Sequence, residues 1–248
     1  NCIFIGENMK VIDWLITSGV ANEYQAKKYL LDKNDLELES LKQRITKEGP
    51  GKILLKKQDP NAYLWCQGVY SPKYTSTHYT LLELCQLEAD LNQPAIVEAI
   101  KILFGEMWKD RGQVRSYRHQ DLCVVVMMVR IACTAKFQDS RISEMIDYIL
   151  EHQMDDGGWN CAWERRPKPK QSSLHTTLSV LEAFNEYKSN GYRYRLEEVK
   201  EKIPQGIEYI LSKRMFRSYK TGEIIKQDML VFSFPYNWRY DILRALTV

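Results

Sequence analysis

Apolar residues along the chain recur mainly with the period of an α-helix. One stretch shows the i, i+3, i+4, i+7 spacing of an amphipathic helix at Ile142, Met145, Ile146 and Ile149. The same spacing recurs in residues 96–103. Apolar and polar residues alternate nowhere over a length that would indicate a substantial strand. The pattern therefore predicts an all-α protein.

A second kind of helical stretch is apolar on nearly every side. It is clearest in "DLCVVVMMVRIAC" (121–133) and recurs in "HYTLLELCQL" (78–87) and "HTTLSVLEAF" (175–184). A helix that is apolar on all sides is buried on all sides. Amphipathic helices that alternate with buried ones predict two layers, with the buried helices inside.

The two kinds of helix alternate in a fixed order along the chain. An amphipathic helix is followed by an aromatic, Gly-containing loop and then by a buried helix, which begins at His78, Asp121, His175 or Asp241. These starts lie 43, 54 and 66 residues apart, and loop insertions account for the drift. Repeats of this length predict an array of helix pairs that cover one another's apolar faces. We therefore expect one domain over residues 1–248, truncated within its last pair.

Charge and cysteine spacing exclude several classes of protein. The net charge of +3 and the lack of a long Lys/Arg stripe argue against a nucleic-acid partner. The six cysteines include no CxxC pair, which excludes zinc fingers and thioredoxins, and a free-thiol chain predicts a reducing, cytoplasmic location. The most apolar run contains Arg130 and is shorter than the ~20 residues of a spanning helix. Any contact with a membrane is expected to be peripheral.

One segment resembles a known family. "YILEHQMDDGGW" (148–159) resembles the QW repeat of squalene/hopene and oxidosqualene cyclases, with Gln153, Gly157 and Trp159 at the repeat's defining positions. "SSLHTTLSVLEAF" resembles an inner-helix start of squalene-cyclase-like bacterial proteins. The resemblance implies an α/α toroid, closed or open, as in the β subunits of protein prenyltransferases. It also implies an elongated apolar molecule, isoprenoid or another lipid, bound in a central cavity. In the repeat we expect the Gln to cap a helix end, the Trp to stack on a neighbouring turn and the glycine to take a positive φ.

Two cyclase motifs are absent, and a zinc site is a further candidate. Neither the D-x-D-D nor the D-D-x-x-D motif occurs in the chain. Asp121 and Cys123, followed later by His175, have the order of the zinc ligands of protein prenyltransferases, although Leu122 replaces that family's glycine. Three protein ligands on Zn²⁺ would leave a position for an incoming thiolate. The alternative is that Asp121 caps a helix and Cys123 is part of the core.

The four buried-helix starts suggest an acid/base site. In a toroid the first turns of the inner helices gather at one mouth of the cavity, which would bring His78, His175, Asp121 and Asp241 together. A helix N-terminus lowers the pKa of a His, whereas a nearby Asp raises it, so the pair of His residues is expected to titrate near neutral pH. The alternative is that the Asp residues cap helices and each His bonds to loop backbone.

Aromatic residues in the same loops are candidates for the wall of a substrate site. An isoprenoid would contact the rings of Tyr74, Tyr79, Trp163, Trp238 and Tyr240. Ordinary packing of loops on the core is the alternative. The sequence thus leaves two functions open, an enzyme that acts on an isoprenoid and a non-catalytic toroid that binds a lipid or a protein partner.

Overall fold

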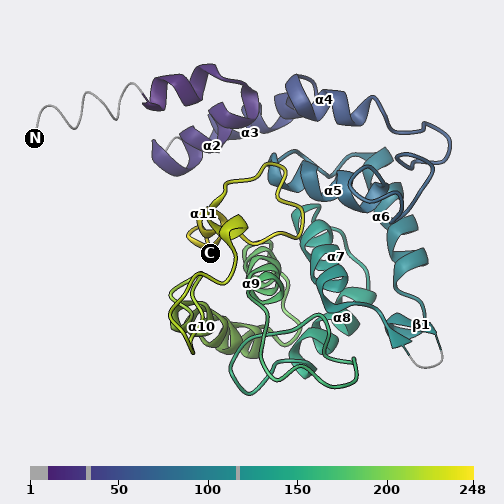
Figure 1. Cartoon of the computed structure of the whole chain (residues 1–248). Coiled ribbons are helices and arrows are strands. Elements are labelled where there is room, and N and C mark those ends of the chain that lie inside the picture. The colour runs from purple at the N-terminus through teal and green to yellow at the C-terminus, as the bar shows by residue number, and fades with distance from the viewer. Residues whose placement is uncertain (1–10, 32–34, 116–117) are drawn as a thin grey trace, which may run out of the picture. The chain divides into compact units, whose positions relative to one another are not determined.

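The computed structural model describes residues 11–31, 35–115 and 118–248, and it is mostly helical (Figure 1). Residues 11–17 are helical. The further helices are α2 (Val20–Leu30), α3 (Asp35–Ile45), α4 (Gly49–Leu55), α5 (Thr77–Gln86), α6 (Pro94–Met107), α7 (Leu122–Thr134), α8 (Arg141–Glu151), α9 (Leu174–Ser189), α10 (Leu196–Ser212) and α11 (Ile242–Ala245). The 3₁₀ turns are η1 (Asp110–Gly112) and η2 (Gln227–Leu230). Strands β1 (Gln113–Arg115) and β2 (Arg118–His119) form one small antiparallel pair. The prediction of a helical protein without a substantial sheet is confirmed for the described residues.

The helices follow the predicted order of amphipathic and buried partners except at α11, which has four residues, buries only Arg244 and leaves Leu243 exposed. Helices α4, α6, α8 and α10 are each followed along the chain by α5, α7, α9 and α11 respectively. Nearly every residue of α5 is buried, whereas α8 buries one face and leaves the other partly exposed. The helix starts expected at His78, Asp121, His175 and Asp241 each lie within one residue of an observed start. The periodicity of the apolar residues therefore located these helices correctly.

The chain packs as two compact units, and the division between them falls within α6. Unit 1 covers residues 1–99 and unit 2 covers residues 100–248. In unit 1, α2 packs on α3, and α4 contacts both α3 and α5. The Gln25 amide donates to the Gln86 carbonyl at 3.0 Å, and Lys28 pairs with Glu88, so α2 is also tied to the end of α5. The single domain over 1–248 stays a prediction.

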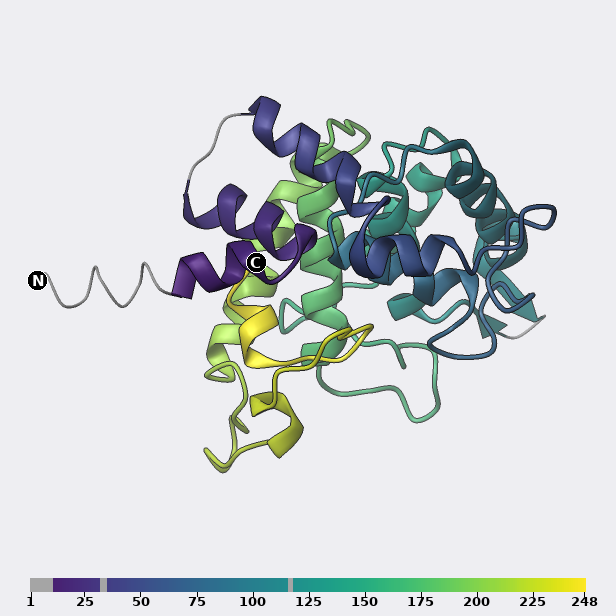
Figure 2. The same cartoon turned by 90° about the horizontal axis from the view of Figure 1, so that it is seen from above.

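Unit 2 is built around the pair α7 and α9. These two helices pack along each other, α8 lies against α7, and α10 lies against α9 and α8 (Figures 1 and 2). An apolar cluster joins α9 to α10 and to the C-terminal segment through Leu178, Leu181, Tyr209, Met229 and Tyr240. Among the described residues, no helix has the length and apolar character needed to cross a membrane.

The segment that resembles a QW repeat is a turn held by side-chain hydrogen bonds. The Gln153 amide donates to the Gly157 carbonyl at 2.8 Å, and the buried Trp159 indole donates to the Ile149 carbonyl at 2.8 Å. The Trp159 backbone N–H donates to the Thr177 hydroxyl in α9 at 3.0 Å. Gly157 has the expected positive φ of 85°. The expected roles were partly wrong, because Trp159 satisfies the end of α8 while Gln153 closes the turn.

The same hydrogen bonds occur a second time, in unit 1. Gln58 donates to the Tyr63 carbonyl at 3.1 Å, and the Trp65 indole donates to the Leu54 carbonyl at 2.8 Å, at the end of α4. The Trp65 N–H donates to the Thr77 hydroxyl at 3.1 Å, at the start of α5. In this copy Tyr63 takes a positive φ of 58° where no glycine is present. The turn is thus a structural repeat that the spacing of Gln, Gly and Trp alone does not reveal.

A buried ion network links three helices of unit 2. The Glu182 carboxylate in α9 accepts from Arg130 of α7 at 2.7 Å and from the Nε and Nη2 atoms of Arg244 in α11 at 2.8 and 2.6 Å. The Arg244 guanidinium also lies 4.4 Å from the centre of the Tyr236 ring. Burial by itself would raise the pKa of Glu182, but the two guanidinium groups outweigh burial and hold the pKa below its usual range.

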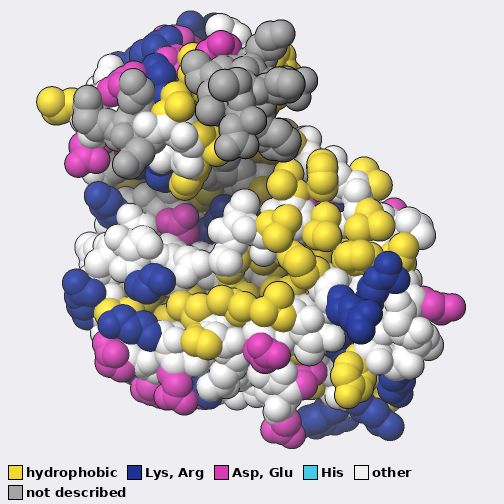
Figure 3. Space-filling view, turned by 90° about the vertical axis from the view of Figure 1, so that its left-hand side faces the viewer, with side chains coloured by type: hydrophobic (Ala, Val, Ile, Leu, Met, Phe, Trp, Pro, Cys, Tyr) yellow, Lys and Arg dark blue, Asp and Glu magenta, His cyan; other side chains and the backbone are white. Residues whose placement is uncertain are grey.

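Part of the apolar surface of unit 2 is exposed. The C-terminal segment exposes the side chains of Val231, Phe232, Phe234, Leu243 and Leu246. Figure 3 shows one face of the molecule, on which hydrophobic side chains form exposed stretches between charged ones. Contiguous apolar surface of this kind commonly contacts a ligand, a lipid or another protein.

The ion network predicts a large effect of removing its shared carboxylate. A Glu182→Gln substitution leaves two enclosed guanidinium groups without their anion, so the free energy of unfolding should fall by about 3 kcal/mol or more in urea titrations. Glu197→Gln is the matched control, because Glu197 is exposed and pairs with the surface residue Lys200 at 2.8 Å. That change should cost less than about 1 kcal/mol. Equal losses in the two variants would contradict the role of the network.

The turn at Gly157 predicts a steric effect beyond that of its backbone angle. Gly157 and Gly191 have nearly the same positive φ, 85° and 84°. A Cβ atom at Gly157 would lie 2.9 Å from the Gln205 carbonyl oxygen of α10, whereas one at Gly191 would meet nothing within 4 Å. Gly191→Ala should therefore cost only the left-handed backbone penalty of about 1–2 kcal/mol. Gly157→Ala should cost measurably more in the same thermal or urea unfolding assay, and an equal cost would show that α10 does not constrain the turn.

Candidate functional site

The larger of the two hollows described in unit 2 lies beside the first turn of α9. Its volume is about 740 Å³, within the range of small-molecule sites. Apolar and aromatic side chains line it, with Leu174, Tyr209, Ile224, Ile225 and Met229 among them. Its lining also includes His175, the acidic residues Asp156 and Glu223, and the lysines Lys170, Lys213, Lys220 and Lys226. The hollow thus combines an apolar wall with an excess of positive charge.

His175 lines this hollow and is held by backbone contacts. Its Nδ1 atom accepts the Tyr240 N–H at 2.8 Å, and its ring centre lies 5.4 Å from that of Trp238. Burial, together with the charges of Lys226 and Arg244, lowers the pKa of His175 to about 4. The imidazole is therefore neutral at neutral pH. The prediction that a nearby aspartate raises this pKa is wrong, because the charged groups that act on His175 are Lys226 and Arg244, and both lower its pKa.

Tyr240, a predicted substrate residue, and Asp241, a predicted acid, lie close to His175 but make structural contacts. The Tyr240 side chain is buried, and its hydroxyl donates to the Met215 carbonyl at 2.6 Å. The Asp241 carboxylate accepts the Arg244 N–H at 2.8 Å and caps α11. Asp241 therefore acts as a helix cap, which was the alternative to its predicted role as an acid. The ring of Trp238, the other predicted substrate residue of this segment, lies beside the His175 ring.

Asp121 occupies the residue before α7 without capping the helix through its side chain. Its carboxylate instead pairs with the Arg118 guanidinium at 3.1 Å. Both residues line the second hollow of unit 2, which does not include His175. Asp121 and His175 therefore belong to different sites among the described residues.

His78 lies in α5 of unit 1, in a buried aromatic environment. Its ring centre is 5.3 Å from that of Tyr70 and 5.2 Å from that of Tyr79. Within the described part of the chain neither ring nitrogen has a hydrogen-bond partner, and burial lowers the pKa of His78 to about 3. The Tyr79 hydroxyl donates to that of Tyr70 at 3.1 Å, and the exposed Tyr74 ring lies 5.2 Å from the Tyr79 ring. A cavity shared by His78 and His175 stays a prediction, because the two residues belong to different units.

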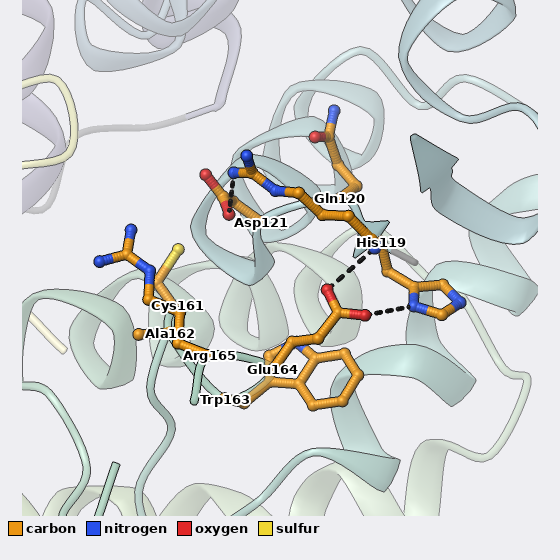
Figure 4. A pocket seen from close by; sticks show the side chains of 9 residues that line it. His119, Gln120, Asp121, Cys161, Ala162, Trp163, Glu164 and Arg165 are labelled. Atoms are coloured by element: carbon orange, nitrogen blue, oxygen red, sulfur yellow. Dashed lines mark hydrogen bonds and ion pairs between the residues drawn. The ribbon is translucent and has the colours of Figure 1, made fainter. Parts of the chain in front are cut away.

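The second hollow has a volume of about 260 Å³ and is shown in Figure 4. Residues 118–121, around β2, form one wall, and residues 161–165, in the loop between α8 and α9, form the other. The Glu164 carboxylate joins the walls, because it accepts the His119 N–H at 2.9 Å and lies 2.8 Å from His119 Nδ1. The carboxylate therefore holds both the backbone and the imidazole of His119.

Trp163, a predicted substrate residue, lies at this second hollow and not beside His175. Its ring lies 3.7 Å from that of His152, and its indole N–H donates to the Tyr148 hydroxyl at 3.1 Å. Tyr148 in turn donates to the Gln120 carbonyl at 2.8 Å. The pattern of apolar residues could not place His152, because it lies in a polar turn outside any helical repeat.

The three predicted zinc ligands do not come together. The Cys123 Sγ atom lies 2.7 Å from the Cys161 Sγ atom, whereas His175 bonds to Tyr240. Throughout the described residues, no three His, Cys, Asp or Glu side chains form a group that could hold a metal ion. The donor set expected from the resemblance to prenyltransferases is therefore not assembled, and its thiol has a different partner.

Comparisons with protein-family models, with curated proteins and with solved structures found no match. The chemistry of the two hollows therefore rests on their own geometry. The hollow at His175 offers an apolar wall, cations and a neutral imidazole. The hollow at His119 offers a His–Glu pair, arginines and a thiol.

The lowered pKa of His175 predicts a specific loss of stability in acid. Between about pH 6.5 and 4 the unfolded imidazole binds a proton while the folded one does not, so the free energy of unfolding falls as the pH falls. His175→Asn should reduce this fall, by up to about 3 kcal/mol over that range, in urea titrations at stepped pH. At pH 8 both states are neutral, and the two proteins should differ only by lost contacts. Parallel pH profiles in acid would contradict the assignment.

Proposed function

We propose that the protein binds an elongated apolar molecule of isoprenoid type, with an anionic head group, in the hollow beside His175. The observation that carries the proposal is the composition of this 740 Å³ hollow, which has apolar side chains and four lysines in its lining. A ligand site needs concave apolar surface for affinity and a few polar groups for orientation. A prenyl chain and a phosphate group match these two parts.

The position of the lysines supports an amphiphile, and not a neutral lipid, as the ligand of this hollow. Lys226 lies close enough to His175 to lower the pKa of its imidazole, and Lys213 lies one residue beyond α10. Burying an alkyl chain contributes about 0.8 kcal/mol for each CH₂ group. An anion beside several lysines adds charge-assisted hydrogen bonds, which are stronger than neutral ones.

Binding without turnover is the better-supported of the two functions. A general acid or base works best when its pKa lies near the working pH, whereas the pKa of His175 is about 4 and that of His78 is about 3. His175 is also occupied by the Tyr240 N–H at 2.8 Å. We therefore assign His175 to holding the segment that lines the site, with its neutral ring as part of the wall.

The proposal includes an α/α toroid related to the terpenoid cyclases. It is supported by the alternation of amphipathic and buried helices and by the two turns at Trp65 and Trp159, which share the same hydrogen bonds. Repeated helix pairs of this kind stack through neighbouring pairs. The exposed apolar side chains at 231–234 lie in the segment that follows the lining residue Met229, where a lipid or a partner could contact the surface.

Direct binding of farnesyl diphosphate tests the proposed function. We expect saturable binding in isothermal titration calorimetry and a native mass spectrum with one bound molecule. Lys226→Glu should weaken binding at least tenfold, because it replaces an attractive charge with a repulsive one. Ile225→Asp should weaken it comparably by placing a carboxylate in the apolar wall. Farnesol, which lacks the charged group, should bind more weakly than the diphosphate and should be insensitive to Lys226→Glu.

Matched controls separate a local effect from a general one. Lys200→Glu changes the same charge on the exposed face of α10, and Leu211→Asp places the same carboxylate at an exposed position outside the lining. Both controls should bind like the unmodified protein. Absence of binding by the unmodified protein, or equal losses in the controls, would overturn the proposal.

A further inference from the structure

We infer that Cys161 and Cys123 form a thiol–disulfide exchange site, in which Cys161 reacts with a small-molecule disulfide and Cys123 resolves the adduct. The two Sγ atoms lie 2.7 Å apart, although the residues are 38 positions apart in the chain. Cys123 is in the first turn of α7, and Cys161 is in the loop between α8 and α9. This site is independent of the proposed lipid site, which lies in another hollow.

The two thiols are both partly exposed but differ in their relation to the smaller hollow. Cys161 lines the 260 Å³ hollow, and Figure 4 shows its sulfur beside that hollow, with the Arg165 side chain nearby. Cys123 is not part of the lining. A disulfide that enters the hollow therefore meets the Cys161 sulfur, and the Cys123 sulfur lies 2.7 Å from it.

The surroundings of Cys161 favour its thiolate. Its Sγ atom accepts the Cys123 backbone N–H at 3.3 Å, so the sulfur lies at the N-terminus of the thirteen-residue helix α7. A helix N-terminus and a hydrogen bond to sulfur both stabilise negative charge. The hydrogen bonds with the thiol and the backbone of Cys123, and to a smaller extent the charge of Arg165, lower the pKa of Cys161 and outweigh burial and the charge of Asp121. The pKa of Cys123 is raised by its hydrogen bond to Cys161 and by burial, so the negative charge of the pair lies on Cys161.

The exchange balances with a disulfide such as oxidised glutathione as the oxidant. The Cys161 thiolate attacks one sulfur of that disulfide, its S–S bond breaks, and one glutathione thiolate leaves. Cys123 then gives up its proton to solvent and attacks the Cys161 sulfur, which releases the second glutathione as a thiolate. Two protein thiols are thereby oxidised to one disulfide, and one glutathione disulfide is reduced to two thiols. Reduced glutathione reverses both steps.

The other described cysteines provide an internal comparison. Cys85 and Cys133 are buried, and Cys66 is exposed in unit 1. The pair is distinguished from them by its two Sγ atoms, which lie 2.7 Å apart. Cys66 is therefore expected to form a lasting mixed disulfide with glutathione, whereas the pair proceeds to a cross-link.

The experiment is incubation of the intact protein in glutathione buffers of stepped redox ratio, followed by acid quench, alkylation and peptide mass spectrometry. The unmodified protein should yield a peptide pair joined through Cys123 and Cys161, with no lasting adduct on either residue. Cys123→Ser and Cys123→Ala should each accumulate one glutathione on Cys161. Cys161→Ser should leave Cys123 unmodified, while Cys66 should carry the same adduct in all samples.

Circular dichroism of each variant establishes that it is folded before its chemistry is compared. Because Cys123 is replaced in two ways, by serine and by alanine, one variant still tests the inference if the other unfolds. A stable adduct on Cys161 in the unmodified protein, a trapped adduct on Cys123 instead of Cys161, or no reaction at either residue would each overturn the inference.

Discussion

The shared carboxylate of Glu182 is the constraint on which the interior of unit 2 depends. A buried carboxylate must be paired, because an isolated buried charge costs several kcal/mol. Arg130 and Arg244 reach it from α7 and α11, at 2.7 and 2.6 Å. One carboxylate thus fixes the register of three helices at once. Apolar contacts tolerate small shifts, whereas this geometry does not, and α11 is positioned by it although that helix has only four residues.

The two tryptophan turns show how the helix pairs are joined within each unit. In both turns an indole N–H satisfies a carbonyl at the end of one helix, and a threonine hydroxyl accepts the backbone N–H of the same tryptophan. Each tryptophan therefore connects the end of one helix to the start of the next. The shared hydrogen bonds define the repeat, since the copy at Trp65 lacks the glycine that marks the copy at Trp159.

The sequence was sufficient for the helices and insufficient for the sites. A period of 3.6 residues is a local signal, so the starts at His78 and His175 could be located within one residue. Contacts such as Cys123 with Cys161 and His119 with Glu164 join residues 38 and 45 positions apart, and no local pattern encodes them. The equivalent positions of the buried-helix starts were a weak guide to chemistry. The environments differ, because His78 is enclosed by tyrosines, His175 bonds to backbone, and the two aspartates pair with different groups.

The threonine contacts have a consequence for how such a chain can change over evolution. Trp65 is joined to Thr77, 12 residues on, and Trp159 to Thr177, 18 residues on, by the same hydrogen bond. The ends of each intervening loop are thus clamped, and its length is free. Closing a longer loop costs little, since the entropy of closure grows only with the logarithm of length. Insertions can accumulate between these anchors while the helices stay in place, so new binding surfaces can arise without a new fold.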